Sequence, residues 1–95
     1  MTLTELRYIV AVARERHFGR AAKASFVSQP TLSIAIKKLE DELRVQVFER
    51  LAEVTLTPVG KQIAEQAQRT LEAAENVWQV ARQGKDQLEG PMKTP

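Results

Sequence analysis

The sequence predicts a mainly α-helical domain made of three helices, a short β-hairpin and one long final helix. Apolar residues recur at spacings of three and four over residues 3–15, 28–43 and 58–83, which is the period of an amphipathic helix. Residues 45–56 instead show short, near-alternating runs rich in valine, a pattern typical of brief strands. A chain of 95 residues has room for one small domain and an appended helix.

Composition excludes several classes of function. The chain is 43% hydrophobic and 27% charged, as in ordinary globular proteins. It has no cysteine, so these 95 residues form no disulfide, thiolate zinc site or cysteine-based active site. The net charge of +2 is weak evidence for nucleic acid. The first residues lack a signal-peptide pattern and no apolar run approaches membrane-spanning length, so we expect a cytoplasmic protein without membrane contact.

The first helix is predicted over residues 3–15. Thr2 and Glu5 form a Thr-x-x-Glu capping box, in which each side chain accepts a hydrogen bond from the other residue's backbone N–H. His17, the single histidine, follows this helix. A helix cap or a neighbour of phosphate is a simpler role for one histidine than that of a metal ligand.

A short second helix over residues 18–25 and a third over 28–43 have the spacing of a helix-turn-helix. Small residues in the second helix allow another helix to approach closely. The turn is Ser25-Phe-Val27, in which Phe26 or Val27 fills the angle between the two helices. Because the acidic residues 40–42 follow the third helix's basic centre, we expect them to form a solvated end that points away from DNA.

The third helix begins at Ser28, whose side chain can cap the first turn, and Pro30 in that turn wastes no backbone donor. The face opposite its apolar stripe starts polar and becomes basic in the middle. We expect this face to enter the major groove of DNA, with Ile34 against a thymine methyl group. The face is formed by Pro30, Ser33, Ile34, Lys37, Lys38 and Asp41.

Two brief strands around residues 45–48 and 54–56 would form a hairpin, and a hairpin after a helix-turn-helix is a wing. Thr57 and Pro58 then read as the cap and first residue of the final helix. The predicted fold is therefore a winged helix-turn-helix over residues 1–57.

The final helix is predicted over residues 58–84, with Gly84 as its stop and residues 85–95 as a hinge or tail. Its length favours a partner helix as cover, which makes it a dimerisation helix; packing wholly against the first helix of the same chain is the alternative. The expected dimer seam has heptad-like spacing and consists of Ala64, Ala67, Leu71, Ala74, Trp78 and Ala81.

Several motifs in this order resemble the DNA-binding region of LysR-type transcriptional regulators. They are Ser28-Gln-Pro-Thr-Leu-Ser33, Ile36-Lys-Lys-Leu-Glu40, Val47-Phe-Glu-Arg50 and Leu56-Thr-Pro-Val-Gly60, and the likeness covers residues 3–84. Arg16-His-Phe-Gly-Arg-Ala-Ala22 is similar to the peroxide-sensing OxyR branch of that family. The resemblance implies a dimer, a tetramer in the full-length protein, and a regulatory domain that follows this chain.

The resemblance also implies roles for single residues. Gln29, Pro30 and Ser33 match base- and backbone-contacting positions, and Thr31 and Lys37 lie beside them. Arg50 matches an arginine at the base of the wing, and Thr57 a threonine whose neighbouring N–H groups can face phosphate. The complete set of expected DNA contacts is Ser28, Gln29, Pro30, Thr31, Ser33, Ile34, Lys37, Lys38, Arg50 and Thr57.

This chain departs from the family pattern at two places. Arg44 stands where the family usually has a glycine that ends the third helix in a left-handed conformation, so we expect strain there. The wing tip, Leu51-Ala-Glu53, is short and lacks basic residues. Its glutamate would be repelled by phosphates, which disfavours a minor-groove contact from this wing.

The predicted function is therefore sequence-specific binding of double-stranded DNA by a homodimer, with no cofactor. A coiled-coil adaptor that uses the third helix against protein is the alternative; it predicts no DNA retention at low salt. An enzyme is disfavoured, because His17 has no nucleophile partner and the sequence has no glycine-rich phosphate loop or paired-carboxylate site.

Overall fold

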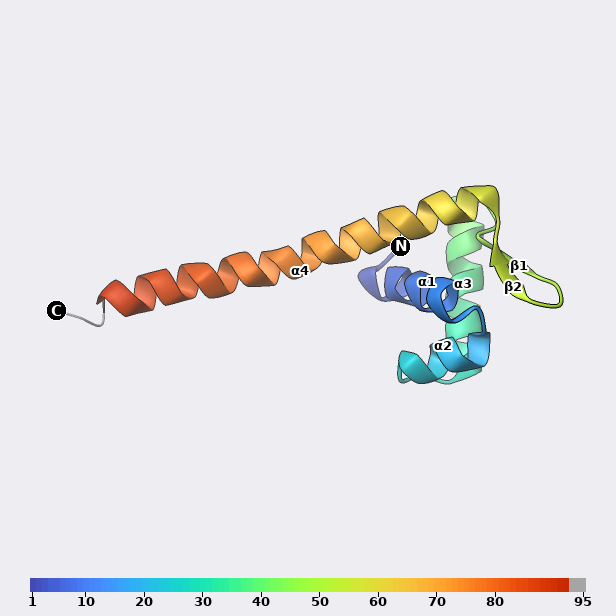
Figure 1. Cartoon of the computed structure of the whole chain (residues 1–95), viewed down its shortest axis with the longest axis horizontal. Coiled ribbons are helices and arrows are strands. Elements are labelled where there is room, and N and C mark those ends of the chain that lie inside the picture. The colour runs from blue at the N-terminus through green and yellow to red at the C-terminus, as the bar shows by residue number, and fades with distance from the viewer. Residues whose placement is uncertain (93–95) are drawn as a thin grey trace.

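A computed structural model describes the backbone of residues 1–92 and the side chains of residues 1–86. The first three helices and the hairpin form one lobe, and the last helix projects from it, so that the chain measures 65 × 25 × 20 Å (Figure 1). This arrangement confirms the predicted class. The elements are α1 (Leu3–Glu15), α2 (Phe18–Ala24), α3 (Gln29–Leu43), β1 (Phe48–Arg50), β2 (Val54–Leu56) and α4 (Pro58–Met92).

Helix α1 has the predicted bounds and the predicted cap. The Thr2 hydroxyl accepts the Glu5 N–H at 3.1 Å, and the Glu5 carboxylate accepts the Thr2 N–H at 2.8 Å. Three apolar residues at helical spacing are buried, and they place α1 at the centre of the lobe against α2, α3 and α4. These residues are Leu6, Ile9 and Val12.

Helix α2 is short and packs closely between α1 and α3 because Ala21 and Ala22 are buried. His17 is its N-cap: the imidazole Nδ1 accepts the Arg20 N–H at 3.0 Å, which confirms the cap role. In the turn that follows, Val27 packs against the core. Phe26 has a φ of 59° and is 94% exposed, so the valine is the residue that fills the turn.

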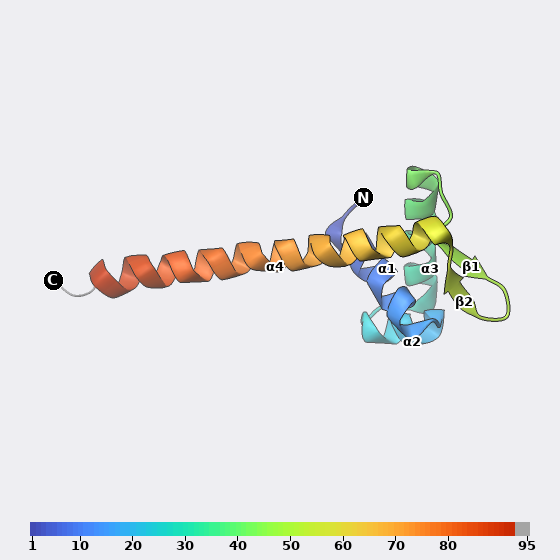
Figure 2. The ribbon, with the colours of Figure 1, turned by 45° about the horizontal axis from the view of Figure 1, so that its top comes forward.

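Helix α3 runs from α2 past the start of α4, and the wing projects to one side of it (Figures 1 and 2). Ser28 is its N-cap, as predicted, and accepts the Thr31 N–H. The predicted apolar stripe is buried from Leu32 to Leu39. The helix ends at Arg44 with φ 60° and ψ 31°, the left-handed conformation expected where glycine is usual.

The wing is a two-stranded antiparallel hairpin in which Phe48 pairs with Leu56 and Arg50 with Val54. It is anchored at its base, where Val47 and Phe48 are fully buried. Each strand has three residues, so the hairpin depends on this anchor for its position.

Helix α4 begins at Pro58, where the Thr57 hydroxyl caps the first turn by accepting the Gly60 N–H at 2.9 Å. The predicted end at Gly84 is wrong, because the helix continues through this residue to Met92. One glycine costs a helix only about 1 kcal/mol relative to alanine. Lys85, Gln87, Leu88 and Glu89 after it have good helix propensity, so the helix is not interrupted at Gly84. Residues 93–95, the rest of the predicted tail, lie outside the described residues.

Candidate nucleic-acid interface

The outer face of α3 is largely exposed, as the sequence predicts. Ile34 at its centre is 68% exposed, an unusual environment for a branched apolar side chain. Ser33 beside it is partly buried. The remaining predicted contacts along this helix and its cap are all exposed: Ser28, Gln29, Pro30, Thr31, Lys37 and Lys38.

Two hydroxyl groups at the start of α3 are tied to each other. The Ser28 and Thr31 oxygens lie 2.8 Å apart, and the serine also caps the helix. Gln29 leans towards the start of α2, since a β-carbon built on Gly19 would lie 3.5 Å from its Oε1. The same side chain lines a hollow shared with the wing tip, including Glu53. The start of α3, the start of α2 and the wing tip therefore surround one hollow that Gln29 lines.

The centre of the outer face carries two lysines that no acidic side chain of residues 1–86 neutralises. Lys37 and Lys38 are exposed and form no ion pair with any residue in the described part of the chain. By contrast, Arg20 on α2 lies 3.7 Å from Glu15 and also donates to its carbonyl at 3.0 Å. The two lysines are thus the charges on α3 that remain available to an anionic ligand.

The prediction of a solvated acidic end on α3 is wrong for Glu40. Its carboxylate is only 8% exposed, whereas Asp41 and Glu42 are exposed as predicted. The sequence contained a signal for this burial: Glu40 lies four residues after buried Ile36 and three before Leu43, at the edge of the apolar stripe.

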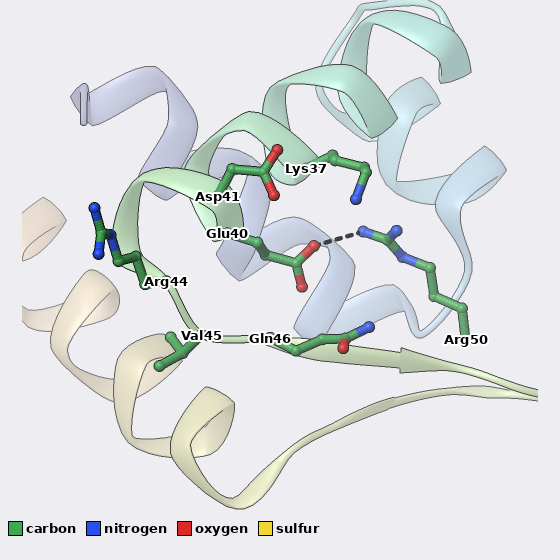
Figure 3. A pocket seen from close by; sticks show the side chains of 7 residues that line it. All are labelled: Lys37, Glu40, Asp41, Arg44, Val45, Gln46 and Arg50. Atoms are coloured by element: carbon green, nitrogen blue, oxygen red, sulfur yellow. Dashed lines mark hydrogen bonds and ion pairs between the residues drawn. The ribbon is translucent and has the colours of Figure 1, made fainter.

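The buried carboxylate accepts three hydrogen bonds from the base of the wing, of which Figure 3 shows the one from Arg50. Oε2 accepts the backbone N–H groups of Val47 at 2.8 Å and Phe48 at 3.2 Å, and Oε1 accepts Nη2 of Arg50 at 3.0 Å. Three donors, one of them charged, satisfy a carboxylate that burial would otherwise destabilise. Sequence reasoning missed this role of Glu40.

Arg50 is therefore bound by other side chains of the protein while part of its own side chain still faces solvent. Its guanidinium carbon lies 5.0 Å from the ring centroid of Phe18, and that ring meets Phe48 edge to face at 6.2 Å. The arginine side chain is 35% exposed. A second open hollow, between α3 and the base of the wing, is lined by Arg50 together with Lys37, Glu40, Asp41 and Gln46 (Figure 3).

Thr57 is engaged within the chain. Its hydroxyl donates to the carbonyl of Gln46 at 2.6 Å, lies 3.3 Å from the carbonyl of Val47, and accepts the Gly60 N–H. The threonine thus ties the start of the wing to the start of α4.

The predicted dimer seam on α4 divides into two parts. Ala64 and Ala67 are buried against the lobe of their own chain, so they are corrected from partner-facing to internal residues. Leu71 is partly buried and packs against the same core. Further along, Ala74 is half-buried and Trp78 is 67% exposed. Ala81 is exposed, and so are the apolar neighbours Val77 and Val80.

Comparison with known families identifies the fold. The family described as bacterial regulatory helix-turn-helix protein, lysR family, matches residues 3–61, more than half of the chain. The chain belongs to the LysR family. The matched segment contains the whole lobe, including the capped α3, the wing and the first residues of α4.

Relatives of this LysR-family chain include regulators of the peroxide response. It is 43% identical over 93 residues to the hydrogen peroxide-inducible genes activator of Pectobacterium carotovorum, covering 97% of this chain and 31% of the relative. It is 42% identical to the DNA-binding transcriptional dual regulator OxyR of Escherichia coli K12, covering 97% and 30%. The chain thus spans about three tenths of the length of these relatives.

Solved structures share the arrangement. Full-length OxyR C199D from Pseudomonas aeruginosa is 61% identical with a TM-score of 0.88, over 93% of this chain and 30% of that one. The DNA-binding domain of BenM in complex with benA site 1 DNA is 36% identical with a TM-score of 0.84, over 87% of this chain and 94% of that one. Among the described residues, no helix is both long and apolar enough to cross a membrane.

Proposed function

We propose that this chain is the DNA-binding segment of a LysR-type transcriptional regulator and binds double-stranded DNA sequence-specifically through α3. The observation that carries the proposal is the exposed surface of α3, the proposed recognition helix: Gln29 is exposed at its start, and Ile34 on its outer face lies next to Lys37 and Lys38, which form no ion pair with any described residue. An α-helix fits the major groove, where each base pair presents a distinct pattern of donors, acceptors and methyl groups. The BenM domain, similar over most of both chains, is solved with DNA.

Two side chains are suited to reading bases. The Gln29 amide can pair with adenine through two hydrogen bonds, and Ile34 can contact a thymine methyl group. Pro30 and Ser33 lie on the same surface and would determine how closely the helix approaches the bases. Together these residues favour half-sites that contain A·T pairs.

The cations and the remaining hydroxyls are suited to the DNA backbone. Lys37 and Lys38 would neutralise phosphates and supply most of the affinity. Arg50 has further N–H donors besides the one bound to Glu40 and would reach a phosphate beside the wing. Ser28, Thr31 and the turn at Thr57 would add neutral contacts to the sugar-phosphate backbone.

The chain acts as a homodimer joined through the outer half of α4. Ala74, Trp78 and Ala81 form the seam that remains once the first part of the helix is covered by its own lobe. An exposed tryptophan flanked by exposed valines forms an apolar patch, and a second helix that packs on this patch would remove it from water. A two-fold dimer would bind an inverted repeat, with half-site centres about 10 base pairs apart or at multiples of that spacing.

The complete protein would be a cytoplasmic, nucleoid-associated regulator of the peroxide response, tetrameric at full length and without enzymatic activity. The names of the relatives support the peroxide response, since several are hydrogen peroxide-inducible genes activators. The sensing part would lie in the two thirds of those relatives that this chain does not cover.

Selection from randomised duplex DNA tests the proposal directly. The 95-residue chain should enrich an inverted repeat, and a footprint on the enriched sequence should cover both half-sites. Failure to retain duplex DNA even at low salt would refute DNA binding and favour a protein adaptor.

A further inference from the structure

Glu40 joins α3 to the wing through a carboxylate that is buried and therefore not placed to contact DNA itself. One of its oxygens accepts the two adjacent N–H groups where the wing begins, and the other accepts Arg50, within the wing itself. Because the carboxylate accepts from two backbone N–H groups with one oxygen and from a side chain with the other, it restrains both the distance of the strand from α3 and the direction of the strand.

The same strand is restrained from its other side. The Val47 carbonyl accepts the Thr57 N–H at 3.0 Å, so its peptide units are held by Glu40 on one edge and by the start of α4 on the other. Arg50 is held between the carboxylate and the ring of Phe18. Besides its pairing with β2, β1 is therefore positioned by Glu40 and by residues bound to Glu40.

We propose that Glu40 is a positioning residue that sets the angle between the recognition helix and the wing, and that DNA affinity depends on it although it touches no DNA. This inference rests on the proposed DNA-binding function. Each three-residue strand is too short to hold its own direction, so the wing needs an external brace. The buried carboxylate supplies that brace, and through Arg50 it places a cation beside Lys37.

The test compares two neighbouring acids. Glu40→Gln and Asp41→Asn each remove one negative charge from α3, and both side chains line the same hollow. By Coulomb's law alone, either change should leave DNA affinity equal or higher, because phosphates repel carboxylates. The positioning role instead predicts that Glu40→Gln, and only this variant, lowers DNA affinity. The reason is that a glutamine amide has a single accepting oxygen, so it cannot accept from the backbone N–H groups with one atom and from Arg50 with the other.

Two readouts on the 95-residue chain measure the effect. In DNA titrations, Glu40→Gln should weaken binding to the selected operator about tenfold, or 1.4 kcal/mol, while Asp41→Asn does not weaken it. Because the chain has no cysteine, nitroxide labels can be attached to Lys38→Cys and Ala52→Cys to measure the helix-to-wing distance without DNA. Glu40→Gln should broaden or shift this distance distribution, and Asp41→Asn should leave it as in the parent.

The outcomes separate the two proposals. An unchanged distance distribution in Glu40→Gln, or affinity as high as that of Asp41→Asn, overturns the positioning role. A parent chain that binds no DNA refutes the proposed function, while the label distance still reports whether Glu40 orients the wing. If circular dichroism shows that Glu40→Gln does not fold, Arg50→Met carries the test through the label distance alone, because Arg50 is itself a proposed phosphate contact: it must broaden or shift the distance distribution, or the role is rejected.

Discussion

Gly60 lies so close to Val47 that a β-carbon on residue 60 would be 2.0 Å from the valine carbonyl oxygen. This approach brings the start of α4 against the base of the wing, where Thr57 and Val47 also share hydrogen bonds. A backbone atom cannot rotate away as a side chain can, so no side chain fits at this position.

Gly60→Ala should therefore lower the free energy of unfolding by at least about 2 kcal/mol, since the backbone must move apart. Urea denaturation followed by circular dichroism measures the change. Gly84→Ala is the matched control, because nothing lies within 4 Å of a β-carbon there and alanine favours a helix. If both variants unfold at the same urea concentration, the close approach at Gly60 is not required.

Arg44→Gly should stabilise the fold by about 1 kcal/mol. Arg44 has a φ of 60°, a conformation that costs residues with a β-carbon about 1–2 kcal/mol and glycine almost nothing. Asp41→Gly, within the same helix, should instead destabilise by about 0.3 kcal/mol, the difference between the helix propensities of aspartate and glycine. Thermal unfolding of both variants checks the pair, and a loss of stability in Arg44→Gly would mean that its side chain contributes more than its conformation costs.

The local elements were predictable from the sequence because their signals are local. Capping residues such as Thr2 and Ser28 accept hydrogen bonds from their own helices, so the starts of α1 and α3 depend on a few neighbouring residues. The left-handed end at Arg44 was expected from the family resemblance, because the family usually has a glycine at this position.

The features that the sequence did not predict depend on distant contacts. Glu40 belongs to an acidic run, and only the return of Val47 and Phe48 to α3 makes it a buried acceptor. The apolar stripe of α4 likewise is compatible with packing against the lobe of its own chain or against a partner helix. The position of α1 buries Ala64 and leaves Trp78 exposed, which periodicity alone does not determine.

Gln29→Ala should weaken binding to the selected operator by about 1–3 kcal/mol and leave binding to random duplex DNA almost unchanged. The reason is that an amide paired with a base discriminates sequences, whereas phosphate contacts are common to all of them. Competition titrations with the two DNAs measure the ratio. Equal losses on both would show that Gln29 does not read a base.

Lys37→Ala should weaken binding to both DNAs and reduce the slope of log K against log salt by about 1, because one phosphate is no longer neutralised. Arg69→Ala is a suitable control, since this exposed arginine lies on α4 and removes the same charge. Its salt slope should equal that of the parent chain. A slope unchanged by Lys37→Ala would exclude a phosphate contact by that lysine.

Trp78→Asp should convert the dimer to monomers in sedimentation velocity experiments. The tryptophan is exposed in the single chain, so a charge at this position does not disturb the lobe. In a helix-helix seam, however, the introduced carboxylate would be desolvated, which destabilises the dimer. The same change at partly buried Leu71 would confuse dimerisation with folding. Gln79→Asp adds the same charge to an exposed neighbour that projects from another side of α4 and should remain dimeric. If Trp78→Asp also remains dimeric, the partner binds elsewhere on the chain.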